Sequence, residues 1–320
     1  MAEPSKTEQR KAEHVNIILQ ENVSAEYNYW NDVRLVHTAL PEIDLDDVDV
    51  SVKFFGKRLE APLIISSMTG GFGMGKEING NLAKAAAEVG VAMGVGSQRA
   101  ALEKPELEPT YAVVKDYGVP LVFANLGAPQ LVPQEGKRAY GVADARKAIT
   151  MIEADAIIIH LNFLQEVVQP EGDRRAKGCL PAIKALATKF PLMAKETGAG
   201  ISRETAQKLK AAGARAIDVG GLGGTSFSAV EHYRARKEAA SLKERLGATF
   251  WNWGSRRRHP SFWRTSACHS SPRAACGAVS TSRKGSPSGP QWRGWRSRCS
   301  RPHGCPRTPR SKSCVRSSRS

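Results

Sequence analysis

The sequence predicts an α/β fold of the (β/α)8 TIM barrel class, with only six βα units encoded before residue 255. Short apolar runs alternate with stretches rich in Ala, Lys and Glu, and successive runs start about 25 to 35 residues apart, the size of one βα unit. The runs are almost continuously apolar, which is typical of parallel strands buried on both faces. Polar residues follow every run, as expected where a barrel carries its active site at the carboxyl ends of its strands.

The expected strands follow an N-terminal extension formed by residues 1–60. They cover residues 63–66, 91–96, 121–125, 156–161, 192–195 and 216–219. Each is followed by a stretch with the composition of a helix. Residues 61–254 are therefore expected to form barrel units one to six.

Residues 255–320 differ sharply in composition from the rest of the chain. They contain 16 Lys or Arg and no Asp or Glu, whereas the preceding residues balance 31 basic against 31 acidic side chains, so the whole formal charge of +16 lies in this segment. No apolar period of 2 or 3.6 continues through it. We expect this Arg-, Ser-, Pro- and Cys-rich tail to be disordered.

Three explanations of the basic tail remain open. It is a genuine arm that binds nucleic acid through phosphate contacts, a zinc module, or the product of a shifted reading frame. The tail cysteines form neither a CxxC pair nor a zinc-finger pattern. They are Cys268, Cys276, Cys299, Cys305 and Cys314.

The genetic code favours the shifted frame. If one base is missing near Trp253 and Gly254, joining the third base of each codon to the first two of the next allows the string IPTAASLLLEDVRLPLLA directly after Gly254. The same operation on residues 272–290 allows SGGLRS and GVDVAKGLALGA. These strings contain the aliphatic strands and acidic residues that the tail lacks, and they would supply strands seven and eight of the barrel.

The first 254 residues have the composition of a soluble domain from a reducing compartment, with charges of both signs and one cysteine, Cys179. No run approaches the roughly 20 apolar residues that span a bilayer, and the N-terminus MAEPSKTEQRKAEH lacks the apolar region of a secretory signal. We expect a cytoplasmic protein without membrane contact.

The polar strand ends predict one shared site. Residues 220–225 form a glycine-rich turn that leads into a helix, where backbone N–H groups can approach a phosphate. A tight turn that needs small residues would look the same, but the last strand loops of a barrel often build a phosphate site. The turn therefore suggests a phosphorylated cofactor.

Seven motifs together resemble the type 2 isopentenyl-diphosphate isomerases, flavoenzymes that interconvert isopentenyl diphosphate and dimethylallyl diphosphate. The motifs are RKAEH, SSMTGG, GSQRAALE, ANLGA, HLNFLQEVVQPEGD, KETGAGIS and DVGGLGGTSF, in family order, and the similarity runs from about Arg10 to Trp253. Related flavin barrels share the general layout, but RKxxH and HLNxxQE look particular to the isomerases. The resemblance implies an FMN-binding barrel and a homo-oligomer.

The resemblance also implies which residues hold FMN. They are Ser66, Ser67, Met68, Thr69, Ser97, Asn125, Lys195 and Thr225. Lys195 is suited to this role because a cation at a strand end could stabilise the negative charge of a reduced flavin ring. The alternative for Lys195 is a strand-end salt bridge with a nearby carboxylate.

The substrate's diphosphate needs cations and a metal. Glu166 resembles the family's Mg²⁺ ligand, a hard oxygen donor that would bridge to diphosphate oxygens. The substrate-binding residues implied by the resemblance are Arg10, Lys11, His14, Ser97, Gln98, Arg99, Asn162 and Gln165, and the catalytic ones are His160, Gln165 and Lys195. Alternatively, Arg10 and Lys11 form a solvated charge pair, and His160 is only a buried polar plug.

The implied chemistry is an allylic shift, in which one proton adds to the terminal alkene carbon and another leaves the carbon two bonds away. FMN would be reduced, with NADPH as the reductant that primes the enzyme, although no electrons are gained or lost overall. Two alternatives stay open: an FMN-dependent dehydrogenase or oxidase of the 2-hydroxy-acid type, and an inactive truncated product whose basic tail binds nucleic acid.

Overall fold

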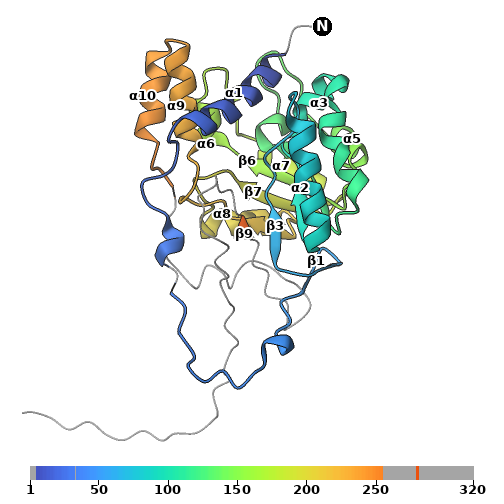
Figure 1. Cartoon of the computed structure of the whole chain (residues 1–320). Helices are drawn as coiled ribbons and strands as arrows, with labels where there is room; N and C mark the ends of the chain where they lie inside the picture. Colours follow the sequence, from blue (N-terminus) through green and yellow to red (C-terminus); the bar gives the residue numbers. More distant parts are fainter. Residues whose placement is uncertain (1–4, 33, 255–278, 281–320) are drawn as a thin grey trace, which may run out of the picture.

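The computed structural model describes residues 5–32, 34–254 and 279–280. The parallel strands form a curled sheet, and helices cover its outer face (Figure 1). The strand order is β8-β7-β6-β5-β4-β3-β9, and every neighbouring pair is parallel. The predicted parallel barrel architecture is confirmed, as a sheet that is open between β8 and β9 within the described residues.

All six expected strands are present, and their bounds differ from the predicted ones by at most two residues. They are β3 Leu63–Ile65, β4 Ala92–Gly94, β5 Val122–Gly127, β6 Ala156–Leu161, β7 Leu192–Glu196 and β8 Ala216–Asp218. The central strands β5 and β7 are buried along their whole length, as their continuous apolar runs predict.

A seventh strand of the sheet lies inside the basic tail, where no strand was expected. It is β9, Val279–Ser280, and it pairs with Leu63 and Ile64 of β3. The physical reason is that an edge strand such as β3 offers unpaired N–H and C=O groups to any extended segment. Residues 255–278 and 281–320, on which the expectations of disorder, zinc binding, nucleic-acid binding and a shifted frame fall, lie outside the described residues.

Helices follow each of the six strands. The helices are α1 Lys6–Gln20, α2 Gly75–Val89, α3 Arg99–Glu103, α4 Pro109–Ala112, α5 Val142–Met151, α6 Phe163–Val168, α7 Cys179–Ala187, α8 Arg203–Ala211, α9 Phe227–Lys237 and α10 Ser241–Thr249. Short 3-10 turns are η1 Tyr29–Asp32, η2 Leu45–Asp47, η3 Pro105–Leu107, η4 Val113–Tyr117 and η5 Ala128–Leu131. Helices α1, α8 and α9 each begin after a serine whose hydroxyl caps a free backbone N–H.

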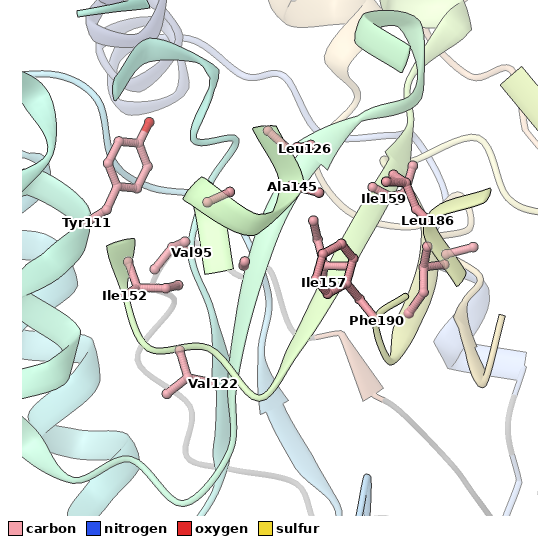
Figure 2. Packing of buried hydrophobic residues seen from close by; sticks show 14 of the residues in the cluster. Val95, Tyr111, Val122, Leu126, Ala145, Ile152, Ile157, Ile159, Leu186 and Phe190 are labelled. Atoms are coloured by element: carbon pink, nitrogen blue, oxygen red, sulfur yellow. The ribbon is translucent and has the colours of Figure 1, made fainter. Parts of the chain in front are cut away.

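The main core lies between the sheet and its helices. Ile157, Ile159 and Leu126 project from the sheet toward side chains of the helical layer, as the close view in Figure 2 shows. A second cluster lies on the opposite face of the strands and includes Phe123 and Ile158. Apolar packing on both faces explains why the strand sequences lack polar alternation.

A β-hairpin packs against this second cluster. Its strands are β1 Val52–Phe54 and β2 Lys57–Leu59, joined by Phe55 and Gly56, both with positive φ. Paired positive φ values match the two-residue turn that suits the twist of a hairpin. The ring of Phe55 lies 5.3 Å, centroid to centroid, from that of Phe123 on β5, so the hairpin contacts the inner face of the sheet.

The N-terminal extension is joined to the last described helices. Ile17 of α1 and Val23 pack with Ala229 and Val230 of α9, and the indole of Trp251 donates to the carbonyl of Ser24. Helix α1 therefore lies beside α9, as Figure 1 shows. This placement brings the RKAEH motif to the same end of the molecule as the strand ends.

One segment of the extension leaves its apolar side chains in solvent. Residues 34–50 extend away from the sheet (Figure 1), with exposed Leu35, Val36, Leu40, Ile43, Leu45, Val48 and Val50. Among the described helices, none combines the length and the apolar character that crossing a bilayer requires.

Candidate active site

Three polar side chains stand side by side at the carboxyl end of the sheet. The register pairs His160 of β6 with Lys195 of β7, and Lys195 with Asp218 of β8. Lys195 is buried, donates to the carbonyl of Glu196 at 2.7 Å and lies 3.5 Å from a carboxylate oxygen of Asp218. The salt bridge considered as an alternative for Lys195 therefore exists.

His160 is held by Asn125, one of the expected flavin contacts. Its Nδ1 lies 2.7 Å from Oδ1 of Asn125, so Nδ1 carries the proton and Nε2 keeps its lone pair. Burial lowers the pKa of His160 to about 3, and the nearby charges of Lys195 and Lys11 act in the same direction. The imidazole is therefore neutral at physiological pH and adds hydrogen-bonding capacity without charge.

The SSMTGG segment after β3 combines free hydroxyls with a very close turn. The hydroxyl oxygens of Ser66 and Ser67 are buried and have no hydrogen-bond partner among the residues that the structure describes. Gly70 and Gly71 have φ values of 125° and 80°, and a Cβ atom on either would collide with the side chain of Tyr111. Only glycine fits both positions, because the backbone passes directly against this ring.

Met68 and Thr69 complete this strand end. Met68 is 41% exposed and Thr69 is half-buried, so both side chains reach the surface of the site. The carbonyl of Thr69 accepts from the backbone N–H of Gly96, which ties the ends of β3 and β4 together. Thr225 forms an isolated antiparallel bridge with Ser24, so the N-terminal extension supports the last glycine-rich turn.

Lys11 is held by acceptors from the protein. Its ammonium donates to the carbonyls of Gly70 and Ser97 and to the hydroxyl of Tyr111, at 2.7 to 2.9 Å. Burial, helped by the positive charge of Arg10, lowers the pKa of Lys11 to about 7. This lysine fastens α1 to the turns after β3 and β4, and it does not form the solvated pair with Arg10 considered above.

His14 and Gln165 meet on a carboxylate that the motifs did not point to. Oε1 of Glu231 lies 2.8 Å from Nε2 of His14 and 3.2 Å from Nε2 of Gln165, and its other oxygen accepts from Arg234 at 2.8 Å. Burial alone would raise the pKa of Glu231, but His14 and Arg234 outweigh it and lower the pKa to about 2. Glu231 is therefore a fixed negative charge.

Arg99 and Glu166 meet through Asp173. Nη1 of Arg99 and Nζ of Lys137 each lie 2.7 Å from the Asp173 carboxylate, and the backbone N–H of Asp173 donates to Oε2 of Glu166 at 2.7 Å. The other Glu166 oxygen accepts from Asn162 at 2.9 Å. Burial raises the pKa of Glu166, while these hydrogen bonds oppose the rise.

Two expected substrate-binding residues, Gln98 and Arg10, differ in where they lie relative to the site. Gln98 is fully buried; its amide donates to the carbonyl of Ala148 and accepts from the backbone N–H of Asn125, so it joins α5 to β5. Arg10 is near the site, 3.8 Å from a carboxylate oxygen of Glu171. The amide of Gln98 is saturated within the core, so its position does not favour substrate contact.

The residues present fit a flavin at the end of β3. A buried hydroxyl without a partner lowers the stability of a protein unless a ligand or water forms a hydrogen bond with it. The hydroxyls of Ser66 and Ser67 are two such groups. At Gly220, with φ of 42°, a Cβ atom would collide with the carbonyl of Glu196. Gly220 itself is buried, so this turn packs closely against the end of β7.

The residues fit a metal only together with a ligand that carries oxygens. Within the described ranges, no group of three or more His, Cys, Asp or Glu side chains is arranged to hold an ion. Glu166 offers one carboxylate, and the Oδ1 of Asn162 beside it is buried, with no partner in the described part of the chain. Mg²⁺ is commonly bound by one or two carboxylates plus phosphate oxygens, which matches this donor set.

The sequence motifs missed Glu231, Asp173, Lys137 and Tyr111. Asp173 ends the HLNFLQEVVQPEGD motif, but the resemblance implies no role for it. Glu231 and Tyr111 lie on helices, among residues with no local signal that would distinguish them from ordinary helix positions. Their functions depend on partners up to 217 residues away along the chain.

The chain is similar to a protein-family model, to two isomerases and to a solved oxidase structure. A family model described as FMN-dependent dehydrogenase matches residues 12–104. The isopentenyl-diphosphate delta-isomerase of Thermoplasma volcanium is 53% identical over 247 residues, which cover 77% of this chain and 71% of the relative. The enzyme of the same name from Methanosarcina mazei is 49% identical over 253 residues, covering 78% and 68%. A mandelate oxidase structure with (S)-mandelic acid aligns over 78% of this chain and 85% of its own, at 14% identity and a TM-score of 0.27, which is too low to carry an argument.

Proposed function

The chain belongs to the isopentenyl-diphosphate delta-isomerase family, and we propose that its strand-end site binds reduced FMN and Mg²⁺ and interconverts isopentenyl diphosphate and dimethylallyl diphosphate. The observation that carries the proposal is the pair of buried, unpartnered hydroxyls of Ser66 and Ser67, at the same end of the sheet as Lys195. An enzyme without a cofactor at this point would leave both groups unsatisfied.

FMN, reduced by NADPH, would supply a ring that can hold and release a proton and stabilise positive charge. Ser66 and Ser67 would donate hydrogen bonds to it, and Lys195 would place a cation beside it. Asp218, 3.5 Å from the ammonium, and the carbonyl of Glu196 keep that cation in position. Holding the lysine by two acceptors limits its motion, which favours a defined electrostatic environment.

The substrate's diphosphate would lie against Arg99, Arg10 and a Mg²⁺ ion on Glu166. Charge-assisted hydrogen bonds from a guanidinium to phosphate oxygens are stronger than neutral ones, and Arg99 is already oriented by Glu103 and Asp173. Asn162 holds the Glu166 carboxylate from the opposite side. Anchoring one end of the substrate places its alkene by the strand ends.

The proton shift needs polar groups near the alkene that do not add a competing positive charge. His160 fits this requirement because its pKa of about 3 keeps the imidazole neutral. Gln165 is fixed by Glu231, which also holds His14. We propose that these side chains exclude water and orient the carbon chain while one proton is added and another is removed.

The test uses protein made from the gene with its reading frame restored after Trp253, because the printed chain is expected to bind FMN weakly. This protein is loaded with FMN, reduced with dithionite or NADPH, and mixed with isopentenyl diphosphate and Mg²⁺ in D2O. Formation of deuterated dimethylallyl diphosphate, followed by NMR, is expected. The oxidase alternative, which the FMN-dependent dehydrogenase match brings up, predicts that 2-hydroxy acids bleach oxidised FMN. Bleaching without isomerisation would contradict the proposal.

We also propose that the bases after the codon for Trp253 are read out of frame. The alignment with the Thermoplasma volcanium relative leaves 29% of that protein unmatched. The alignment spans 247 residues, nearly the 254 residues of this chain that precede the tail. The exposed apolar side chains of residues 34–50 support a missing layer of structure. A chain without that layer is expected to have poor solubility and weak FMN binding.

Resequencing the gene across residues 250–258 tests the frame, since an extra guanine would restore the family sequence. Expressing both versions then compares them directly: tighter FMN binding by the restored version is expected, and equal binding would contradict the proposal. The balanced charge and single cysteine of residues 1–254 support a cytoplasmic location, and family membership supports a homo-oligomer, which sedimentation measures.

A further inference from the structure

We infer that Asp173 is a positioning residue that holds two cations, Arg99 and Lys137, beside the metal-side carboxylate Glu166, and that Lys137 is a further cation for the diphosphate. The inference rests on the proposed function, because it concerns the diphosphate end of the same site. It assigns roles to two residues for which neither the motifs nor the comparisons provide one.

The first step is the geometry of the Asp173 carboxylate. Its Oδ2 accepts from Arg99 at 2.7 Å and from Gln130 at 3.4 Å, and its Oδ1 accepts from Lys137 at 2.7 Å. The residue is 5% exposed. One buried carboxylate thus fixes two positive groups next to each other, which their mutual repulsion would otherwise separate.

The second step is the backbone of Asp173. Its N–H donates to Oε2 of Glu166, seven residues earlier, so the chain must turn back onto α6. Gly172 makes this turn possible, because a Cβ atom there would collide with the carbonyl oxygen of Glu166. The same residue therefore orients an anionic metal ligand with its backbone and two cations with its side chain.

The third step concerns the solvent exposure of the two cations. Arg99 is almost fully buried, with a side chain 8% exposed, whereas the Lys137 side chain is 46% exposed and reaches Asp173 from the β5–α5 loop. A buried guanidinium with a partly exposed ammonium beside it can receive a group with several negative oxygens. Diphosphate bound to Mg²⁺ is such a group, since phosphate oxygens accept from both cation types.

Asp173→Asn keeps the side-chain shape and the backbone N–H but removes the charge that holds Arg99 and Lys137. Inorganic pyrophosphate with Mg²⁺ is titrated into the full chain by calorimetry. We expect affinity to fall about 10- to 100-fold, the usual cost of losing a residue that orients a ligand-binding group. Lys137→Met is expected to weaken pyrophosphate binding and to leave the affinity for FMN unchanged.

Asp144→Asn is the matched control. Asp144 is also buried, pairs with Arg138 through two hydrogen bonds and accepts from the N–H of Gly141, and neither partner is an expected site residue. It should lose stability without losing pyrophosphate affinity. In turnover assays, Asp173→Asn should raise KM more than it lowers kcat, because the anchor acts equally on substrate and transition state.

The outcomes separate the inference from the proposed function. If the unchanged chain binds Mg²⁺-pyrophosphate and Asp173→Asn binds it equally well, the positioning role is overturned and the isomerase site stands. Equal losses in Asp173→Asn and Asp144→Asn also overturn it, because they indicate a general loss of stability. If the unchanged chain binds no pyrophosphate, the diphosphate site of the proposed function is itself overturned.

Discussion

The Nε2 atom of His14 lies 2.8 Å from Oε1 of Glu231, so that the first helix of the chain and α9 share a buried hydrogen bond. The residues are 217 positions apart, and the Glu231 side chain has no exposed surface. Arg234, one turn further along α9, forms an ion pair with the other carboxylate oxygen of Glu231. This contact attaches the N-terminal extension to the barrel at the point where Gln165 enters the site.

Glu231→Gln is expected to lower the free energy of unfolding by about 3 to 5 kcal/mol, because it removes the one fully buried carboxylate among the four that contact Arg234. Urea denaturation measures the change. Glu238→Gln is the control: Glu238 also contacts Arg234, at 3.4 Å, but its side chain is 46% exposed, so a change of about 0.5 kcal/mol is expected. Similar losses in both variants would show that the burial of Glu231 adds nothing to its contact with Arg234.

Stability should decrease as pH falls from about 6.5 toward 3, in part because of His160. The unfolded chain takes up a proton on this residue near its ordinary pKa of 6.5, whereas the folded chain does so only near 3. Protons therefore favour the unfolded state throughout this window, by up to about 1.4 kcal/mol per pH unit. His160→Gln removes this contribution. Urea denaturation at pH 6.5 and at pH 5 should then show a smaller difference in the free energy of unfolding between the two pH values.

The exposed His37 provides the comparison for this pH effect. His37→Gln should keep the slope of the unchanged chain, since the residue lies outside the core. NMR gives a second measurement, in which the ring protons of His160 should not titrate between pH 8 and 5. Titration of His160 near pH 6.5 would contradict the neutral role assigned to it.

Gly70→Ala is expected to destabilise the protein by about 2 to 5 kcal/mol, because the new methyl group meets the Tyr111 ring at a backbone φ of 125°. The melting temperature and the affinity for FMN should both fall, since the same turn follows Ser66 and Ser67. Gly73→Ala is the control in the same loop. Nothing lies within 4 Å of its added Cβ, so a change within about 0.5 kcal/mol is expected.

Lys11→Met should lower the free energy of unfolding by about 2 to 4 kcal/mol, because it removes three hydrogen bonds at a buried position, although the carbonyl of Ser97 keeps the hydroxyl of Tyr111 as a donor. Hydrogen exchange should show faster exchange of the α1 amides, since this lysine fastens α1 to the strand-end turns. Lys6→Met changes an exposed residue at the start of the same helix and should have little effect. Unchanged exchange in Lys11→Met would mean that α1 is held by its other contacts.

The strand order and the position of the site were predictable from local sequence. Continuous apolar runs such as residues 156–161 specify buried parallel strands, and the polar residues after them converge because parallel strands end at one edge. The serines after β3 could be assigned from their motif. Strand β9 could not, because its pairing depends on the free edge of β3 rather than on an apolar pattern of its own.

The sequence alone determined the six βα units, the family motifs and the abrupt change in charge at residue 255, because each is a local pattern of composition or spacing. Only the tertiary structure decided which motif residues are free and which are occupied. Lys11 and Gln98 look like ligand-binding groups in sequence, yet backbone carbonyls from distant segments satisfy them. Asp173 and Glu231 look ordinary, yet the fold surrounds them with cations. Hydrogen bonds and ion pairs depend on distances of about 3 Å between groups far apart in the chain, which no local pattern specifies.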